Sequence, residues 1–275
     1  MGVLLAVGNL KGGVGKSTLA VNLASAFAAA GWRTTLIDTD PQQTATRWSA
    51  QRLLPCRVAT SPIRDLADAG AWAARAESIR REAEVVVVDL PSVAAPALGA
   101  ACLMATGLLI PSGATQTDAS TLQRTLHYVR TARRERRDKG PLAWIVPTRI
   151  VRTGFLRRRL ELGTLPGLGE PATPPLTVDP SWDAAFAAGR WIGDCAPGSR
   201  AHKELLAVFE TVVGGLRARG VLPEPQALPT APKATSAEPA AVPPASTADP
   251  QRSYVERVTR RRGAAAPLGR PVVAE

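Results

Sequence analysis

The chain has 275 residues, of which 45% are hydrophobic and only 4% aromatic, so leucine, valine, alanine and isoleucine must fill its core. Its formal charge of +11 predicts attraction to a polyanion, nucleic acid first and an anionic membrane second, although coding bias also produces arginine-rich chains. The three widely spaced cysteines exclude a disulfide framework and a CxxC metal site, and they favour a reducing compartment. No apolar stretch approaches the roughly 18 residues that a spanning helix requires, so no transmembrane segment is expected.

Strand and helix patterns alternate along the first 150 residues. Short apolar runs predict strands at Val3–Val7, Thr34–Ile37, Val58–Thr60, Val85–Val88, Leu108–Ile110 and Trp144–Val146. Helical spacing predicts helices at Ser17–Ala30, Pro41–Leu54, Ile63–Ala83 and Thr117–Arg137. This alternation indicates an α/β protein with a mostly parallel central sheet flanked by helices.

The pattern weakens after residue 150. Helices are expected at Arg152–Leu162 and His202–Arg219, and the Gly- and Pro-rich segment Leu165–Pro175 is expected to be a surface loop without an assigned role. The composition changes near residue 221, because residues 221–275 hold 10 of the 24 prolines. We therefore expect a folded domain over residues 1–220 and a disordered tail over 221–275, with Ser253–Arg262 as a candidate short basic helix.

A glycine loop joins the first strand to the first helix. It reads Lys11-Gly12-Gly13-Val14-Gly15-Lys16-Ser17-Thr18. Such a loop directs backbone N–H groups and the positive end of a helix at one point, which suits phosphate oxygens. Lys16 can reach the β and γ phosphates of ATP, and the Ser17 hydroxyl can ligate Mg²⁺. The loop departs from the usual pattern, since Leu10 stands at the first glycine position and Lys11 follows it. A three-layer P-loop NTPase fold is the expected architecture.

Acidic residues close two of the predicted strands. Asp38 and Asp40 follow one strand, and Asp89 follows the valine run. Because ligands of parallel sheets bind at the carboxyl ends of the strands, these carboxylates should converge on the glycine loop. We predict that Asp38 and Asp89 support Mg²⁺, Asp89 through water, and that Asp40 orients the attacking water. The alternative is that each aspartate serves only as a turn or cap residue.

These motifs carry a family resemblance over residues 2 to about 215. The segment Lys11–Thr18, with its early lysine, resembles the deviant Walker A motif of the ParA/MinD ATPases. Leu36–Gln43 resembles the second motif of that family, and Val85–Pro91 resembles its Walker B strand. Ile110-Pro111 followed by Asp118 resembles the loop and helix after the next strand. Thr148-Arg149 lies where the family often contacts adenine, and the short N-terminus is similar to that of the small ParA (ParF-like) subgroup.

The resemblance implies an ATP-bound homodimer in which Lys11 reaches the phosphates of the partner subunit. It implies slow ATP hydrolysis, stimulated by a ParB-like or other adaptor protein, and non-specific DNA binding by the dimer. Such a protein would be cytoplasmic and nucleoid-associated, and it would segregate plasmids, chromosomes or other cargo. Non-specific DNA binding needs only Lys and Arg side chains that neutralise phosphates.

Two groups of basic residues are candidates for the DNA contact. One group lies along the predicted helix at Thr117–Arg137 and just beyond its end. It comprises Arg124, Arg130, Arg133, Arg134, Arg136, Arg137 and Lys139. A solvated helix face is an equally good interpretation of that group. Because the resemblance places the DNA surface in the C-terminal half, the favoured residues are Arg157, Arg158, Arg159, Arg190, Arg200 and Lys203.

Other functions are open at this point. The first is a MinD-like membrane-associated regulator of cell division or of assembly positioning. It needs a C-terminal amphipathic helix with bulky apolar residues, for which residues 253–260 offer only Tyr254, Val255 and Val258. The chain lacks the cluster cysteines of a nitrogenase-type iron protein and the further domain of an amidotransferase-type synthetase. It also lacks the tyrosine cluster of a tyrosine-kinase relative.

Overall fold

A computed structural model describes residues 2–63, 66–92, 95–113, 115–151 and 168–225. Contacts within the chain divide it into residues 1–229 and 230–275. The predicted helix at Arg152–Leu162, the basic residues Arg157–Arg159, and nearly all of the predicted tail lie outside the described residues. Residues 221–225 are described, and the Trp32 side chain donates a hydrogen bond to the Pro223 carbonyl at 2.8 Å.

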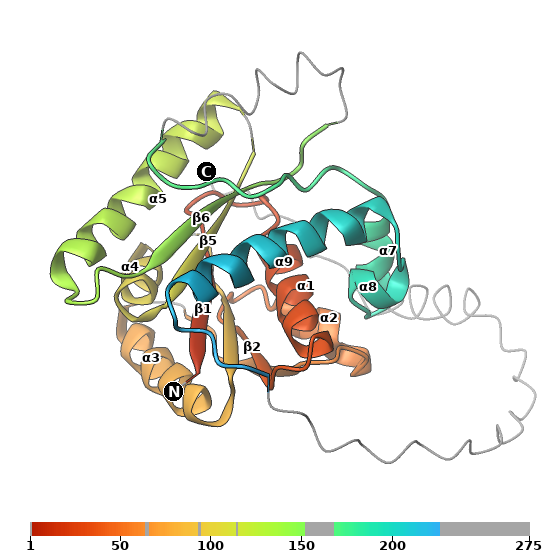
Figure 1. Cartoon of the computed structure of the whole chain (residues 1–275), viewed down its shortest axis with the longest axis horizontal. Coiled ribbons are helices and arrows are strands. Elements are labelled where there is room, and N and C mark those ends of the chain that lie inside the picture. Colours follow the sequence, from red (N-terminus) through yellow and green to blue (C-terminus); the bar gives the residue numbers. More distant parts are fainter. Residues whose placement is uncertain (1, 64–65, 93–94, 114, 152–167, 226–275) are drawn as a thin grey trace, which may run out of the picture. The chain divides into compact units, whose positions relative to one another are not determined.

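A parallel sheet of six strands forms the centre of the described domain, in the order β3-β2-β4-β1-β5-β6 (Figure 1). The strands are β1 (Val3–Val7), β2 (Thr34–Asp38), β3 (Arg57–Thr60), β4 (Val85–Asp89), β5 (Gly107–Ser112) and β6 (Leu142–Pro147). All neighbouring pairs are parallel, which confirms the predicted architecture. The four valines of β4 are fully buried, as a central strand covered on both faces requires.

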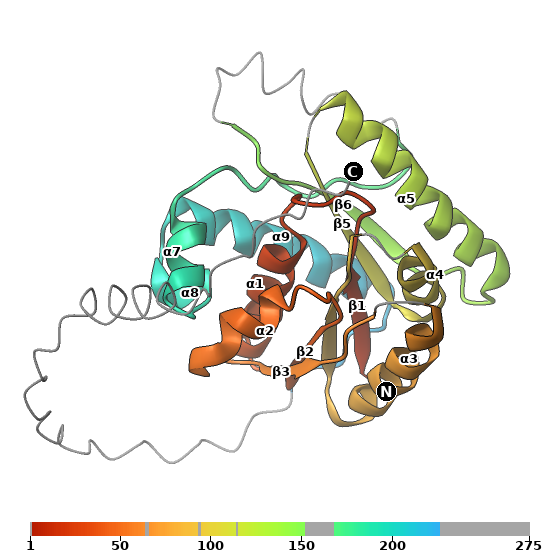
Figure 2. The same ribbon diagram turned by 180° about the vertical axis from the view of Figure 1, so that it is seen from behind.

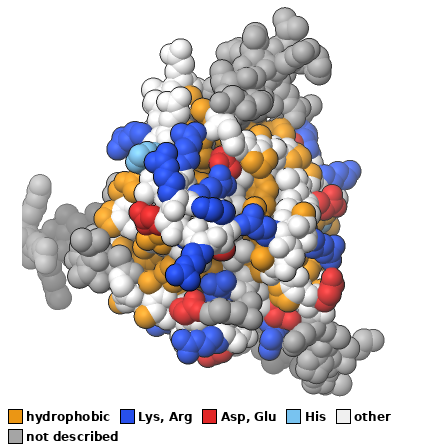
Figure 3. All heavy atoms as spheres, turned by 60° about the vertical axis from the view of Figure 1, so that its left-hand side comes forward, with side chains coloured by type: hydrophobic (Ala, Val, Ile, Leu, Met, Phe, Trp, Pro, Cys, Tyr) orange, Lys and Arg blue, Asp and Glu red, His pale blue; other side chains and the backbone are white. Residues whose placement is uncertain are grey.

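Helices cover both faces of the sheet (Figures 1 and 2). They are α1 (Lys16–Ala29), α2 (Thr44–Trp48), α3 (Leu66–Glu82), α4 (Ala95–Met104), α5 (Gln116–Glu135), α7 (Ser181–Ala187), α8 (Ile192–Cys195) and α9 (Arg200–Ala218). One core packs the sheet against α1, α2 and α7–α9, and the other packs it against α3, α4 and α5. Along β1, Val3, Leu5 and Val7 belong to the first core and Leu4 and Ala6 to the second. Figure 3 turns the α5 side forward and shows Lys and Arg side chains gathered on that face.

The helix predicted at Pro41–Leu54 is wrong in extent. It begins only at Thr44, because Gln43 has a left-handed backbone conformation with φ 51°, and it passes at Ser49 into a 3-10 turn that ends at Gln51. Asp38 also fixes its first turn by accepting hydrogen bonds from the backbone N–H and the hydroxyl of Thr46, both at 2.7 Å. Helices α4, α7 and α8 were not predicted, since they are short or carry apolar residues without helical spacing.

The carboxyl ends of the central strands meet at one edge of the sheet. In the strand register, Val7 of β1 and Asp38 of β2 both lie opposite Asp89 of β4. The glycine loop leaves β1 at this same edge and returns into α1. The fold therefore places the loop beside the two acidic strand ends, with β4 next to β1 and β2 beyond it, and the carboxylates lie at the loop as the sequence predicts.

Candidate functional site

The glycine loop wraps around the amino group of Lys16. Gly13 and Gly15 have φ values of 71° and 84°, a conformation that residues with a side chain rarely adopt. Lys16 is buried, and its Nζ donates a hydrogen bond to the Lys11 carbonyl at 3.1 Å. Burial lowers the pKa of Lys16, and the nearby charges of Asp89 and Asp40 oppose that shift. The loop thus holds a cation at its centre with carboxylates facing it.

Asp89 is a fully buried carboxylate at the end of β4. Among the described residues, neither of its oxygens has a hydrogen-bond partner of ordinary geometry. Burial raises its pKa to about 7, although the Ser17 hydroxyl and the Lys16 charge act to lower it. A buried carboxylate without a partner is costly, and a cation held between Asp89 and Ser17 would remove that cost.

This pKa gives a prediction for the nucleotide-free protein. The carboxyl takes up a proton on folding between its unfolded pKa of about 4 and its folded pKa of about 7, so stability falls as the pH rises through that window. We therefore compare the free energy of unfolding of Asp89→Asn with that of the wild type. This difference should shift in favour of the variant by on the order of a few kcal/mol between pH 4 and pH 8. Urea unfolding without Mg²⁺ measures this difference.

The matched control for that experiment is Asp138→Asn. The hydrogen bond from Arg136 lowers the pKa of Asp138 to about 2, so its contribution is present at neutral pH and is lost in acid. Because the unfolded pKa is about 4, that loss occurs only below about pH 4, so the stability difference between Asp138→Asn and the wild type should change little between pH 4 and pH 8. A stability difference between Asp89→Asn and the wild type that does not change with pH would show that Asp89 is ionised in the folded protein.

The two remaining acidic residues are engaged in local structure. Besides Thr46, Asp38 accepts a hydrogen bond from the backbone N–H of Asp40 at 3.1 Å. Asp40 accepts a hydrogen bond from the backbone N–H of Gln42 at 2.8 Å. The Asp40 residue is partly exposed at the rim of the site. The turn-residue interpretation therefore applies to both, while their predicted catalytic and metal roles stay predictions.

Lys11 forms an ion pair within its own chain. Its Nζ lies 2.5 Å from Asp118 Oδ1 and donates a hydrogen bond to the Thr117 hydroxyl at 3.1 Å. Asp118 also caps α5 together with Thr115. Burial acts to raise the pKa of Asp118, but the hydrogen bonds from Lys11 and Thr115 outweigh it and the pKa is lowered. The sequence singled out both residues without pairing them, because 106 intervening residues separate them.

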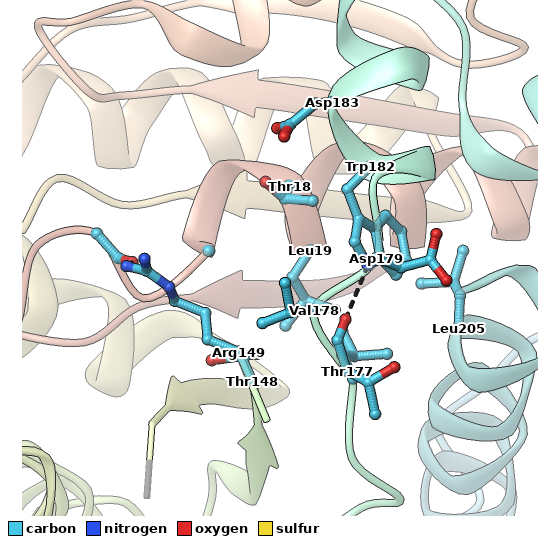
Figure 4. A pocket seen from close by; sticks show the side chains of 13 residues that line it. Thr18, Leu19, Thr148, Arg149, Thr177, Val178, Asp179, Trp182, Asp183 and Leu205 are labelled. Atoms are coloured by element: carbon cyan, nitrogen blue, oxygen red, sulfur yellow. Dashed lines mark hydrogen bonds between the residues drawn. The ribbon is translucent and has the colours of Figure 1, made fainter. Parts of the chain in front are cut away.

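A pocket of about 320 Å³ opens beside the loop (Figure 4). Arg149 lies on one side, where its guanidinium donates a hydrogen bond to the Gly13 carbonyl at 2.6 Å. Trp182 lies on the other side and donates to the Thr177 carbonyl at 3.2 Å, and Thr18 and Leu19 of α1 lie between them. An apolar and aromatic wall with a few polar groups suits the base and sugar of a nucleotide.

Sequence reasoning found Arg149 but missed the opposite wall of this pocket. That wall comes from Leu176–Asp179, Trp182 and Leu205, which follow the weakly patterned segment after residue 150. A tryptophan beside an acidic cluster in that region was the only available signal. Thr148 also holds the loop, since its hydroxyl donates to the Val14 carbonyl at 2.8 Å.

The family model for the CobQ/CobB/MinD/ParA nucleotide binding domain matches residues 5–165. The chain belongs to this family. It is a ParA/MinD-type P-loop ATPase, which confirms the resemblance that its loop and strand-end motifs carry.

Curated relatives match parts of this ParA/MinD-type chain. It is 34% identical over 131 residues to "Maintenance of carboxysome distribution protein A" of Gloeobacter kilaueensis, which covers 45% of the chain and 55% of that protein. It is 62% identical over 39 residues to "Chromosome partitioning protein ParA" of Caulobacter vibrioides, covering 14% and 15%. It is 32% identical over 132 residues to "Chromosome-partitioning ATPase Soj" of Thermus thermophilus, covering 39% and 53%. The chain thus matches at most 55% of the length of any of these three relatives.

Solved structures share the fold at low identity. Apo McdA from Cyanothece has a TM-score of 0.63 and 18% identity, with 77% of this chain and 100% of that chain covered. The septum site-determining protein MinD of Pyrococcus horikoshii, complexed with Mg-ADP, has a TM-score of 0.64 and 12% identity, with 80% and 99% covered. These likenesses support the α/β fold of the ParA/MinD ATPases.

The residues present fit a magnesium ion only in part. Across the described ranges, no group of three or more His, Cys, Asp or Glu side chains could hold a metal on its own. Mg²⁺ commonly takes one or two carboxylates and completes its shell with water and phosphate oxygens. The unpartnered carboxylate of Asp89 beside the Ser17 hydroxyl fits that pattern, whereas the oxygens of Asp38 already accept hydrogen bonds.

The DNA-binding residues favoured from sequence are only partly visible. Arg157, Arg158 and Arg159 lie outside the described residues. Arg190 is exposed after α7, and Arg200 and Lys203 are exposed on the first turn of α9. In the part of the chain that the structure describes, no helix has both the length and the apolar character needed to span a membrane.

Proposed function

We propose that this ParA/MinD-type ATPase is a nucleotide-dependent dimerisation switch that binds DNA without sequence preference and positions a plasmid, a chromosome or another cargo. The position of Lys11 at the mouth of the loop and the charge of +11 support the proposal. Relatives named for chromosome partitioning and for carboxysome distribution support the positioning role. The ATPase domain would comprise residues 1–220, with residues 221–275 as a separate tail.

One observation carries the nucleotide-binding part of this proposal. The buried cation of Lys16 and the buried, unpartnered carboxylate of Asp89 lie at the same glycine loop, beside the Ser17 hydroxyl. A buried cation, a metal-binding carboxylate and a helix N-terminus together match a nucleoside triphosphate with its metal. A purely structural loop would gain nothing from keeping both charges out of water.

Each residue then has a proposed role toward ATP. The backbone of Lys11–Thr18 and the Lys16 amino group bind the phosphates, and Arg149 borders the base pocket. Ser17 and Asp89 would hold Mg²⁺, with Asp38 behind them, and the ion would neutralise developing phosphate charge. Asp40, partly exposed at the rim, would orient the attacking water. Lys11 would leave Asp118 and reach the phosphates of the partner subunit, where it stabilises transition-state charge as an arginine finger does.

The proposal also names partners and a location. The ATP-bound dimer would associate with the nucleoid in the cytoplasm. A ParB-like or other adaptor protein would stimulate slow hydrolysis and so release the dimer from DNA.

The test compares DNA retention in three nucleotide states. The full chain is mixed with a fluorescent duplex of random sequence and a non-hydrolysable ATP analogue, ADP or no nucleotide, and its mass is followed by sedimentation. We expect a dimer and DNA retention with the analogue only, with retention falling steeply with salt because counterions are released. A monomer that binds DNA equally in all three states would contradict the switch.

A further inference from the structure

The outer face of α5 carries charge of one sign. Between residues 119 and 139 there are seven basic side chains but only two acidic ones, Glu135 and Asp138. Arg124, Arg130 and Arg134 are exposed at intervals that place them on one side of the helix, together with His127. The exposed Arg137 and Lys139 continue this basic face beyond the end of the helix. In Figure 3 Lys and Arg side chains gather on the side of the molecule that α5 forms.

The ion pairs divide these cations into two sets. Arg133 pairs with Glu170, and Arg136 pairs with Asp138 and donates to the carbonyls of Cys102 and Ala105 at the end of α4. Arg130 donates a hydrogen bond to the Leu168 carbonyl at 3.0 Å. These three arginines are engaged in contacts within the fold. Four others have neither an acidic partner nor a hydrogen bond from the side chain within the described residues: Arg124, Arg134, Arg137 and Lys139.

A solvated helix face does not account for this pattern. Solvated faces usually alternate in sign, so that neighbours three or four residues apart attract one another. Here Arg130 and Arg134 lie four residues apart on α5 and repel each other, and Arg137 adds a third like charge just beyond the end of the helix. This repulsion costs stability unless an anion neutralises the charges. The exposed positions of α5 also lack bulky apolar residues, which a helix lying in a membrane surface needs.

The dimensions suit a nucleic-acid duplex. Arg124 and Arg134 are ten positions apart, which is about 15 Å along a helix axis. Duplex DNA carries one charge per roughly 1.7 Å of its axis, so a segment of this length meets several phosphates.

The same helix is fixed to the nucleotide loop on its opposite side. Thr125 donates to Asn9 Oδ1 at 3.0 Å and accepts from the Leu10 backbone N–H at 3.4 Å, and Asp118 pairs with Lys11. The basic face is thus attached directly to the residues that surround the phosphate site.

We infer that the basic face of α5, defined by Arg124, Arg134, Arg137 and Lys139, binds the phosphate backbone of duplex DNA. The inference rests on the proposed function, and it replaces the C-terminal cluster as the main DNA contact. Arg133 and Arg136 support this face by holding the end of α5 in place, without contacting DNA themselves.

The experiment compares two triple variants with the same change in net charge. The first is Arg124→Ala/Arg134→Ala/Arg137→Ala, and the second is Arg190→Ala/Arg200→Ala/Lys203→Ala. Binding of the full chain to a random duplex is measured by fluorescence anisotropy with a non-hydrolysable ATP analogue at several salt concentrations. Melting temperature and basal ATPase activity verify folding, since none of the six residues lies in the nucleotide site. Vesicles of anionic phospholipid serve as a second probe.

We expect the α5 variant to lose at least tenfold in DNA affinity near 0.1 M salt. The slope of log affinity against log salt should become shallower by about 2 to 3, since each lost phosphate contact contributes about 0.9. The second variant should retain most of its affinity and slope. An unchanged slope in the α5 variant overturns the inference while wild-type DNA binding, and so the proposed function, stands. Wild-type binding to vesicles but not to DNA overturns both.

Discussion

Lys16→Ala is expected to reduce ATP affinity by at least about 100-fold. Lys16 is the buried cation of the glycine loop, and its amino group would exchange the Lys11 carbonyl for phosphate oxygens. Hydrogen bonds between charged groups contribute roughly 1.5–3 kcal/mol each, and about 1.4 kcal/mol corresponds to tenfold in affinity. The variant also leaves Asp89 without its nearest cation, which adds repulsion toward the phosphates. Titration with a fluorescent ATP analogue measures the loss.

Lys203→Ala is the matched control, because it removes the same charge from an exposed position on α9. It should bind the analogue as the wild type does. Thermal unfolding distinguishes a defective site from a defective fold. ATP affinity that stays within a factor of three in a folded Lys16→Ala protein would refute the assignment of the phosphate site.

Lys11→Ala is expected to keep ATP affinity within a few fold and to lower the hydrolysis rate by about 100-fold or more. Charges that act on a transferring phosphoryl group as arginine fingers do are worth about 10³ to 10⁵ in rate. The Lys11 side chain is one-third exposed at the mouth of the loop, and Asp118 keeps its hydrogen bonds from Thr115 when the lysine leaves. Single-turnover hydrolysis and sedimentation in the presence of ATP measure the two effects.

Asp118→Asn separates a catalytic role of Lys11 from a structural one. It breaks the ion pair of 2.5 Å but keeps the lysine, and the amide oxygen can still cap the N-terminus of α5. This variant should hydrolyse ATP at least as fast as the wild type, since the lysine is released from its own chain. Equal losses in Lys11→Ala and Asp118→Asn would mean that Lys11 acts through Asp118 and not on a partner subunit.

The sequence predicted most of the sheet because its signals are local. Buried parallel strands favour short, largely apolar runs, and all six predicted runs, from Val3–Val7 to Trp144–Val146, lie within strands of the structure. The glycine loop was predicted equally well, since its geometry depends on consecutive residues. The helix at Pro41–Leu54 failed for the opposite reason: its start depends on Asp38, which binds Thr46 from a neighbouring strand end.

The parts of the site that sequence could not predict depend on contacts between distant segments. Trp182 of α7 and Leu19 of α1 border the same pocket only because the fold brings their segments together, and the pairing of Lys11 with Asp118 requires β5 to lie next to β1. Likewise, an arginine-rich helix cannot reveal from composition which of its cations are neutralised. The structure shows that Glu170 pairs with Arg133, whereas Arg124 has no such partner in the described chain.

The sequence alone therefore determined the fold class, the phosphate loop and the acidic strand ends, because residue type and short-range spacing specify strands, glycine turns and strand termini. Only the tertiary structure decided three further features: that Asp89 is buried without a partner, that Lys11 rests on its own chain, and that the basic face of α5 is left unpaired. Burial and charge pairing are properties of surroundings that segments far apart in the chain create together.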